Sequence, residues 1–149
     1  MLPREVFNLT SLRELSLPGH DTAVPPEISN LANLEELYIG HGPLKTLPPE
    51  IWDLPYLSAL NVCATFLEKL SPEIGNLSNL EHLLLWNISF TPVAALPPEI
   101  GRLRNLMSLF IWGHKLTHIP PEIGDLCNLT ELSLVGSGLT SLPAELGRL

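Results

Sequence analysis

A phrase of about two dozen residues recurs along the chain, and this repetition constrains the fold more than any other feature. Its most regular part is Pro-Pro-Glu-Ile or a close variant, whose glutamates lie at positions 5, 27, 50, 73, 99, 122 and 145. The steps between them are 22, 23, 23, 26, 23 and 23 residues. A regular period of this length indicates a solenoid, in which each coil packs mainly on its neighbours. We therefore expect residues 1–149 to form one domain of about six repeats.

Each repeat also carries the pattern Leu-x-x-Leu-x-Leu, with Ile or Val at some of these positions. The final Leu-x-Leu alternates with a period of two residues, which predicts a short strand with one buried face. Equivalent strands in stacked coils would form a parallel sheet with a spacing of about 4.8 Å. The six expected strands are centred on residues 15–17, 37–39, 60–62, 83–85, 109–111 and 132–134.

The proline phrase predicts how the chain returns from one strand to the next. The first proline holds its predecessor in an extended conformation, and the second suits the first position of a helical turn. The glutamate then lies in the first turn, where the helix dipole favours negative charge. Ile51 and Leu54, three residues apart, are expected to share a face that points into the core. Because glycine follows soon after in most repeats, we expect the helical turns to be short.

A unit of this kind resembles the leucine-rich repeat family, in particular the 23-residue intracellular type of bacterial repeat proteins, plant Ras-group repeat proteins and plant immune receptors. The resemblance implies an α/β solenoid with parallel strands on its concave face. Short helical or 3-10 turns and loops would cover the convex face, and the fold would bind other proteins. The family usually has asparagine three residues after the last strand leucine, but this chain has His20, Gly42, Thr65, Ile88, His114 and Ser137. Since glycine and isoleucine cannot replace the asparagine hydrogen bonds, we expect a looser turn at that edge.

The net charge of −8 arises from 16 acidic and 8 basic residues. Seven of the acids are the repeat glutamates, and without them the net charge is only −1, so the acidity is largely architectural. The scattered bases form no Lys/Arg stripe, so we expect neither nucleic acid nor an anionic membrane as a partner. No apolar run suits a membrane helix, no signal peptide is apparent, and the cysteines number two. These features favour a cytoplasmic location.

Motifs of catalysis and cofactor binding are absent from the sequence. It contains no Gly-rich phosphate loop with lysine, no H-E-x-x-H, no G-x-S-x-G and no C-x-x-C. We therefore expect no enzyme and no cofactor. We also expect no metal site, because His20 and His114 share a repeat position but lie four coils apart. Cys63 and Cys127 are nearly three coils apart, too far for a disulfide, so both are expected to be thiols.

Large apolar residues stand at strand positions that should face away from the core. Stacked coils would place Leu84, Trp86, Phe110 and Trp112 side by side, with Tyr38 two coils away. Cys63 belongs to the same outward row as the tryptophans, and His82 belongs to the row before. Exposed apolar clusters often mark interfaces, where tryptophan and tyrosine are enriched at binding hot spots. The candidate partner-binding residues are Tyr38, His82, Leu84, Trp86, Phe110 and Trp112; alternatively, the rings only cover the sheet and stack on one another.

Two irregularities add to this picture. The distance from strand to proline is nine residues in most repeats but twelve between Leu85 and Pro97. The extra residues fall within 88–95, where they would lie beside the tryptophans or form a tolerated loop. At the end of the chain, the pattern leaves Leu142, Leu146 and Leu149 without a following coil. We expect either a fragment of a longer array or self-association through uncapped ends.

These features favour a non-enzymatic protein-protein interaction module that binds a protein or peptide through its concave face. One alternative is the recognition or regulatory arm of a larger signalling protein, such as a GTPase, kinase, ubiquitin ligase or nucleotide-binding immune receptor. Another is a purely structural or engineered scaffold.

Overall fold

In the computed structural model, strands alternate regularly with short 3-10 turns. The structure describes residues 3–17, 23–64, 66–86, 94–112, 116–136 and 138–149. The strands are β1 (Glu14–Leu17), β2 (Glu36–Gly42), β3 (Ala59–Ala64), β4 (His82–Trp86), β5 (Ser108–Trp112) and β6 (Glu131–Val135). The 3-10 turns are η1 (Arg4–Asn8), η2 (Pro26–Asn30), η3 (Pro49–Asp53), η4 (Pro72–Asn76), η5 (Pro98–Arg102), η6 (Pro121–Asp125) and η7 (Ala144–Arg148).

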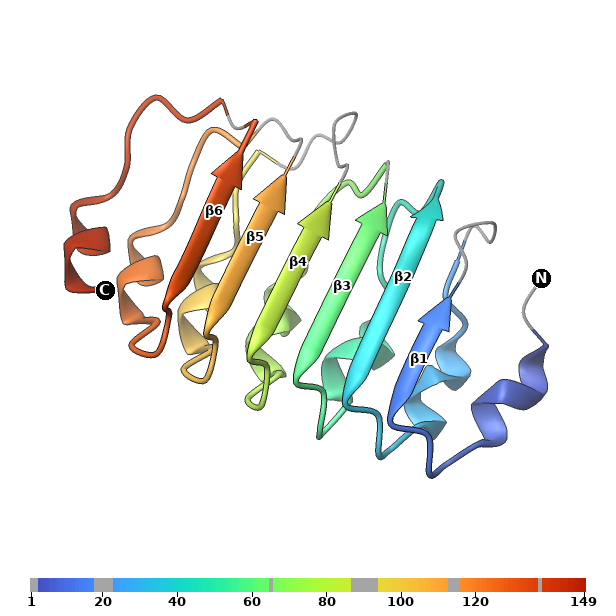
Figure 1. The fold of residues 1–149 in the computed structure, drawn as a ribbon. Helices are drawn as coiled ribbons and strands as arrows, with labels where there is room; N and C mark the ends of the chain where they lie inside the picture. Colours follow the sequence, from blue (N-terminus) through green and yellow to red (C-terminus); the bar gives the residue numbers. More distant parts are fainter. Residues whose placement is uncertain (1–2, 18–22, 65, 87–93, 113–115, 137) are drawn as a thin grey trace.

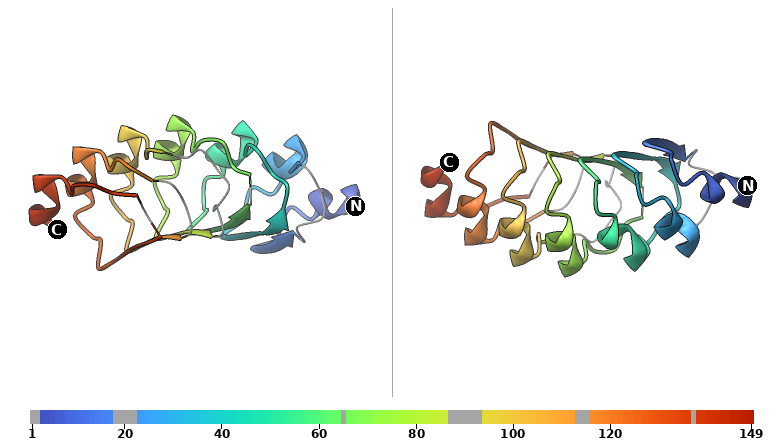
Figure 2. Two further views of the ribbon diagram at one scale, coloured as in Figure 1. Left: turned by 90° about the horizontal axis from the view of Figure 1, so that it is seen from above. Right: turned by 90° about the horizontal axis from the view of Figure 1, so that it is seen from below.

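The strands form one parallel sheet in the order β1-β2-β3-β4-β5-β6 (Figure 1). Equivalent leucines of successive repeats are in register: Leu15, Leu37, Leu60, Leu83, Leu109 and Leu132. The 3-10 turns line the outer side of a shallow arc and the sheet lines its inner side (Figure 2). The predicted α/β solenoid, with its parallel strands on the concave face, is confirmed.

The proline phrase acts as its chemistry predicts. In the third coil Pro48 is extended, with φ −66° and ψ 144°, and Pro49 begins η3. The backbone N–H of Leu54 then donates to the carbonyl of Ile51 and closes the turn. Each described turn spans five residues, and the expectation of short helical turns is confirmed.

A single apolar core runs along the inside of the coils. Ile51, Leu57, Leu60 and Leu83 are fully buried, as expected for the inward positions of a repeat. Burial decreases in the last coil, where Leu132 is 37% exposed. Each coil is therefore shielded mainly by its neighbours, which is the property that makes stacked repeats cooperative.

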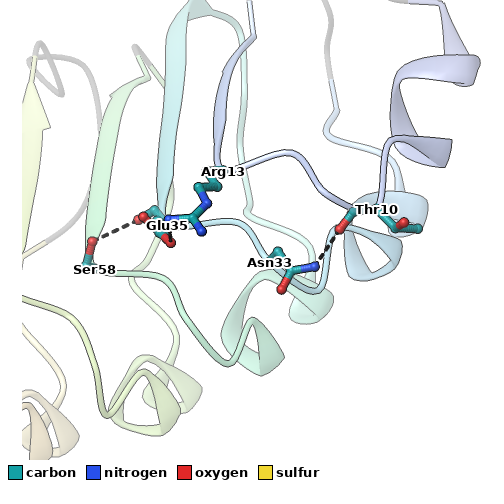
Figure 3. Close-up of polar contacts among 5 residues, drawn as sticks. All are labelled: Thr10, Arg13, Asn33, Glu35 and Ser58. Carbon is teal, nitrogen blue, oxygen red and sulfur yellow. Dashed lines mark hydrogen bonds and ion pairs between the residues drawn. The ribbon is translucent and has the colours of Figure 1, made fainter.

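Hydrogen bonds between coils follow the edge where loops enter the strands. The side-chain amide of Asn33 donates to the Thr10 carbonyl at 2.8 Å, and the Ser58 hydroxyl donates to the Glu35 carbonyl at 3.1 Å (Figure 3). At the same edge Arg13 forms an ion pair with Glu35 at 3.0 Å (Figure 3). Polar side chains thus tie each entry loop to the coil before it.

The opposite edge is where the usual family asparagine is replaced. Only Gly42 of the six replacing residues is described; the others, at 20, 65, 88, 114 and 137, lie outside the described residues. At Gly42 the pairing of β2 with β3 changes register between Ile39 and Gly42. Because Gly42 is the only described residue that replaces the family asparagine, the predicted looser turn can be compared with the structure at this position alone. Most of the three-residue insertion also lies outside it, at 87–93.

Candidate functional site

The register of the sheet aligns outward-facing residues into rows across the strands. The middle row runs Ser16, Tyr38, Asn61, Leu84, Phe110 and Ser133. The row before it runs Glu14, Glu36, Ala59, His82, Ser108 and Glu131. The predicted neighbours therefore do lie on adjacent strands, on the face opposite the leucine core.

Three aromatic rings pack together on β4 and β5, and we call Trp86, Phe110 and Trp112 the aromatic cluster. The ring centroids of Trp86 and Trp112 are 4.7 Å apart with an interplanar angle of 57°. Phe110 meets Trp112 edge to face, at 6.2 Å and 82°. Leu84 extends the apolar surface, since it is in register with Phe110. Trp86 remains 36% exposed.

Hydrogen bonds hold the surroundings of these rings. The indole N–H of Trp112 donates to the hydroxyl of Ser133 at 2.9 Å. Nδ1 of the half-buried His82 hydrogen-bonds the hydroxyl of Ser108 at 2.6 Å. The Trp112 indole and the His82 side chain are therefore held in place before any partner arrives, which lowers the entropy cost of binding.

A hollow of about 410 Å³ lies beside the aromatic cluster, over β1 to β4. We call it the acidic pocket, because Glu14 and Glu36 both line it. Tyr38, which is 38% exposed, lines the pocket rather than the aromatic cluster. Leu84 lines the pocket and is in register with Phe110 of the aromatic cluster, so the pocket and the cluster adjoin each other.

The prediction that the positions of the outward rows are exposed is wrong at Ser108 and at Cys63. Cys63 is in register with Trp86 but is only 4% exposed, because a small side chain is shielded where its neighbour in the row is a large ring. Burial raises the pKa of its thiol. Cys127 is exposed, and the prediction that the two cysteines are thiols rather than a disulfide is confirmed.

The sequence pattern does not predict the acidic pocket or the burial of the Asn61 side-chain oxygen. Asn61 lies in the middle row, but its side-chain oxygen is buried and has no hydrogen-bond partner within the described chain. The available signal was the stacking of Glu14 on Glu36, next to Ser16 and Tyr38 in the following row. The depth of the acidic pocket could not be predicted from residue spacing, because it depends on the volumes of the neighbouring side chains.

The described ranges also bear on metal binding and on membrane insertion. They contain no group of three or more His, Cys, Asp or Glu residues placed to hold a metal ion. His20 and His114 lie outside the described residues. Within those same ranges, no helix combines the length and apolar character needed to cross a membrane.

The stacked coils, leucine ladder and ordered concave surface define a repeat solenoid of the kind that commonly serves as a protein-interaction module. Residues 51–149 match the family described as leucine-rich repeat region, and the chain belongs to this leucine-rich repeat family.

Solved structures of leucine-rich repeat proteins are similar over nearly the whole chain. A leucine-rich repeat protein of Leptospira interrogans is 35% identical, with a TM-score of 0.86 over 99% of this chain and 37% of that one. The leucine-rich repeat domain of the type III effector XopL is 31% identical, with a TM-score of 0.83 over 99% of this chain and 53% of that one.

A third similar structure is the Arabidopsis receptor kinase HAESA in complex with the peptide hormone IDA and the co-receptor SERK1. It is 25% identical, with a TM-score of 0.82 over 98% of this chain and 26% of that one. The chain thus spans between about a quarter and a half of these three structures. The search among curated proteins found no match.

Proposed function

We propose that this chain is a non-enzymatic module that binds a protein or peptide through its concave face. The observation that carries the proposal is the aromatic cluster, which is ordered by ring contacts and by the Trp112–Ser133 hydrogen bond yet leaves Trp86 36% exposed. Trp and Tyr in ordered surroundings are the usual hot spots of protein interfaces. The candidate contact residues are those predicted from the sequence: Tyr38, His82, Leu84, Trp86, Phe110 and Trp112.

The competing explanation is that the rings stack only for stability. Stacking accounts for the contacts of Trp86, Phe110 and Trp112, but not for the exposed Tyr38 or for the adjoining hollow. A surface that is both apolar and hollowed suits the burial of a partner's side chains. The complex of HAESA with a peptide hormone supports a peptide or protein as the partner class.

The alternative role, as the recognition arm of a larger signalling protein, is favoured by one specific observation. The chain corresponds to 53% of the XopL domain and 26% of the HAESA structure, so similar coils occur within longer arrays. In either role the chain would bind rather than catalyse. We propose a cytoplasmic location, since two cysteines are too few for a disulfide framework.

The test is affinity capture with variants that remove the rings. We expect Trp86→Ala/Trp112→Ala to keep the circular dichroism spectrum of the parent and to lose the partners that the parent captures. Tyr56→Ala is the matched control, because Tyr56 is an aromatic residue 57% exposed at the strand-entry edge, away from the concave rows. Equal capture by the parent and the double variant would refute the proposal.

A further inference from the structure

We infer that the partner presents a basic side chain to the acidic pocket and an apolar side chain to the aromatic cluster. The inference rests on the proposed function and adds the chemistry and spacing of what is bound. The candidate occupant is an extended peptide segment with Lys or Arg near one end and an aromatic or aliphatic residue near the other.

The charge of the concave face supports a basic partner. Glu14 and Glu36 are in register on β1 and β2, and both line the pocket. Like charges on neighbouring strands repel each other, and a cation between them removes the repulsion. The outward rows of β1 to β6 contain a third acid, Glu131, and no Lys or Arg at any described position.

The two pocket glutamates also differ from the acids around them. Glu27, Glu35 and Glu68 form ion pairs with Arg4, Arg13 and Lys45, each in a neighbouring coil. Neither Glu14 nor Glu36 forms a side-chain ion pair with any residue that the structure describes. Their carboxylates therefore remain available to a partner.

Asn61 supplies a second, independent indication of a donor. Its buried side-chain oxygen lacks a hydrogen-bond partner in the described chain, and the same residue lines the pocket. An acceptor left without a donor in a buried position is costly. The guanidinium of arginine and the ammonium of lysine are donors without acceptor atoms, which suits a site of carboxylate and amide oxygens. Tyr38 adds an exposed ring against which a cation can lie.

The geometry of the sheet sets the spacing between the two anchors. Glu36 on β2 is in register with Ser108 on β5, three strand spacings of about 4.8 Å away, and Trp112 lies four residues further along β5 at about 3.3 Å each, so roughly 20 Å separates Glu36 from Trp112. An extended peptide that crosses the strands advances about 3.3 Å per residue. The basic and apolar residues should therefore be about six positions apart in the partner.

A selection from a random 12-residue peptide library displayed on phage tests this inference directly on the full chain. We expect the selected peptides to be enriched in Lys or Arg placed about five to seven positions from an aromatic or aliphatic residue. Their binding should weaken with rising salt, since partly exposed charges are screened.

Two matched variants identify the pocket. In Glu14→Gln/Glu36→Gln, we expect synthetic copies of the selected peptides to bind about tenfold more weakly, the scale of one lost hydrogen bond to a charged group. Selection on this variant should no longer favour basic residues. Glu5→Gln/Asp53→Asn removes the same charge from exposed positions in η1 and η3, and should leave binding unchanged.

The outcomes separate this inference from the proposed function. Peptides that need Trp86 and Trp112 but carry no enriched basic residue, or that ignore the Glu14/Glu36 substitutions, overturn the inference and leave the proposed function standing. If no selected peptide depends on either tryptophan, the inference and the proposed function both fail. If Glu5→Gln/Asp53→Asn weakens peptide binding as much as Glu14→Gln/Glu36→Gln does, the effect is one of overall charge. That result would also overturn the inference that the acidic pocket binds the basic side chain.

Discussion

Single side chains tie each coil to the one before it. Four asparagines, each just before the first leucine of its repeat, donate to a backbone carbonyl of the preceding coil at 2.7 or 2.8 Å: Asn33, Asn79, Asn105 and Asn128. Tyr56 holds the equivalent position in the third coil. These bonds satisfy carbonyls that no strand or turn would otherwise pair.

Loss of one of these asparagines should destabilise the stack. We expect Asn105→Ala to lower the free energy of unfolding by about 1 kcal/mol, because the Ser78 carbonyl loses its donor. Urea denaturation followed by circular dichroism measures the change. Asn76→Ala, at an exposed position at the end of η4, is the control and should change stability much less. Equal effects of the two substitutions would contradict this role for the asparagines.

A second prediction at this scale concerns the pKa of Glu73. The hydroxyl of Ser71 donates to its carboxylate and lowers the pKa, with smaller contributions from the Glu73 backbone N–H and from Lys69. A carboxyl whose pKa is lowered by folding stabilises the protein above its unfolded pKa, and that contribution is lost as pH falls through the folded pKa.

We therefore expect Ser71→Ala to raise the pKa of Glu73 toward its ordinary value. Stability should then fall less on acidification through this range than it does in the parent. Titration of the Glu73 side-chain carbon signal by NMR measures the pKa directly. An unchanged pKa in the variant would show that the Ser71 hydroxyl is not its main cause.

At the level of elements, the 3-10 turns stack so closely that several positions exclude a side chain. A Cβ atom added at Gly101 would lie 2.6 Å from the backbone oxygen of Glu122, and one at Gly124 would lie 2.5 Å from that of Glu145. Glycine is needed there for close approach of η5, η6 and η7. In η3 the equivalent residue is Trp52, which is buried in the core instead.

Alanine at these positions should therefore force successive turns apart. We expect Gly101→Ala to destabilise the protein by about 1–3 kcal/mol, the usual range for overpacking. Gly147→Ala is the control, because nothing lies within 4 Å of its added Cβ. The midpoint of urea denaturation should fall for the first variant and stay nearly constant for the second. Similar midpoints would mean that the turns can separate without cost.

The sequence predicts most at the level of elements, because the signals there are local. Leucine alternation places every strand and its register, and proline chemistry places the turns. The hydrogen bonds of the four asparagines between coils were not predicted, since the carbonyls that accept them belong to the preceding coil and come within reach only when the coils stack. The burial of Cys63 and the depth of the acidic pocket were also missed, because both depend on the volumes of neighbouring side chains rather than on spacing.

Across the whole molecule, stacking gives the two sides of the solenoid different chemistry. The convex side carries the repeat glutamates at the starts of its turns. The concave side has the carboxylates of Glu14 and Glu36 over β1 and β2, which form no ion pair with any described residue, and the aromatic cluster over β4 and β5. An ordered, continuous surface with an acidic and an apolar end can fix both the composition and the direction of a bound segment.

The most direct test of the binding face is the NMR spectrum of the three indole N–H groups during titration with a library-selected peptide. Trp86 and Trp112 belong to the aromatic cluster, whereas Trp52 is 2% exposed in the core and serves as an internal control. We expect the Trp86 and Trp112 signals to shift saturably while the Trp52 signal stays in place. A bound peptide that leaves the Trp86 and Trp112 signals unmoved would contradict binding at the concave face.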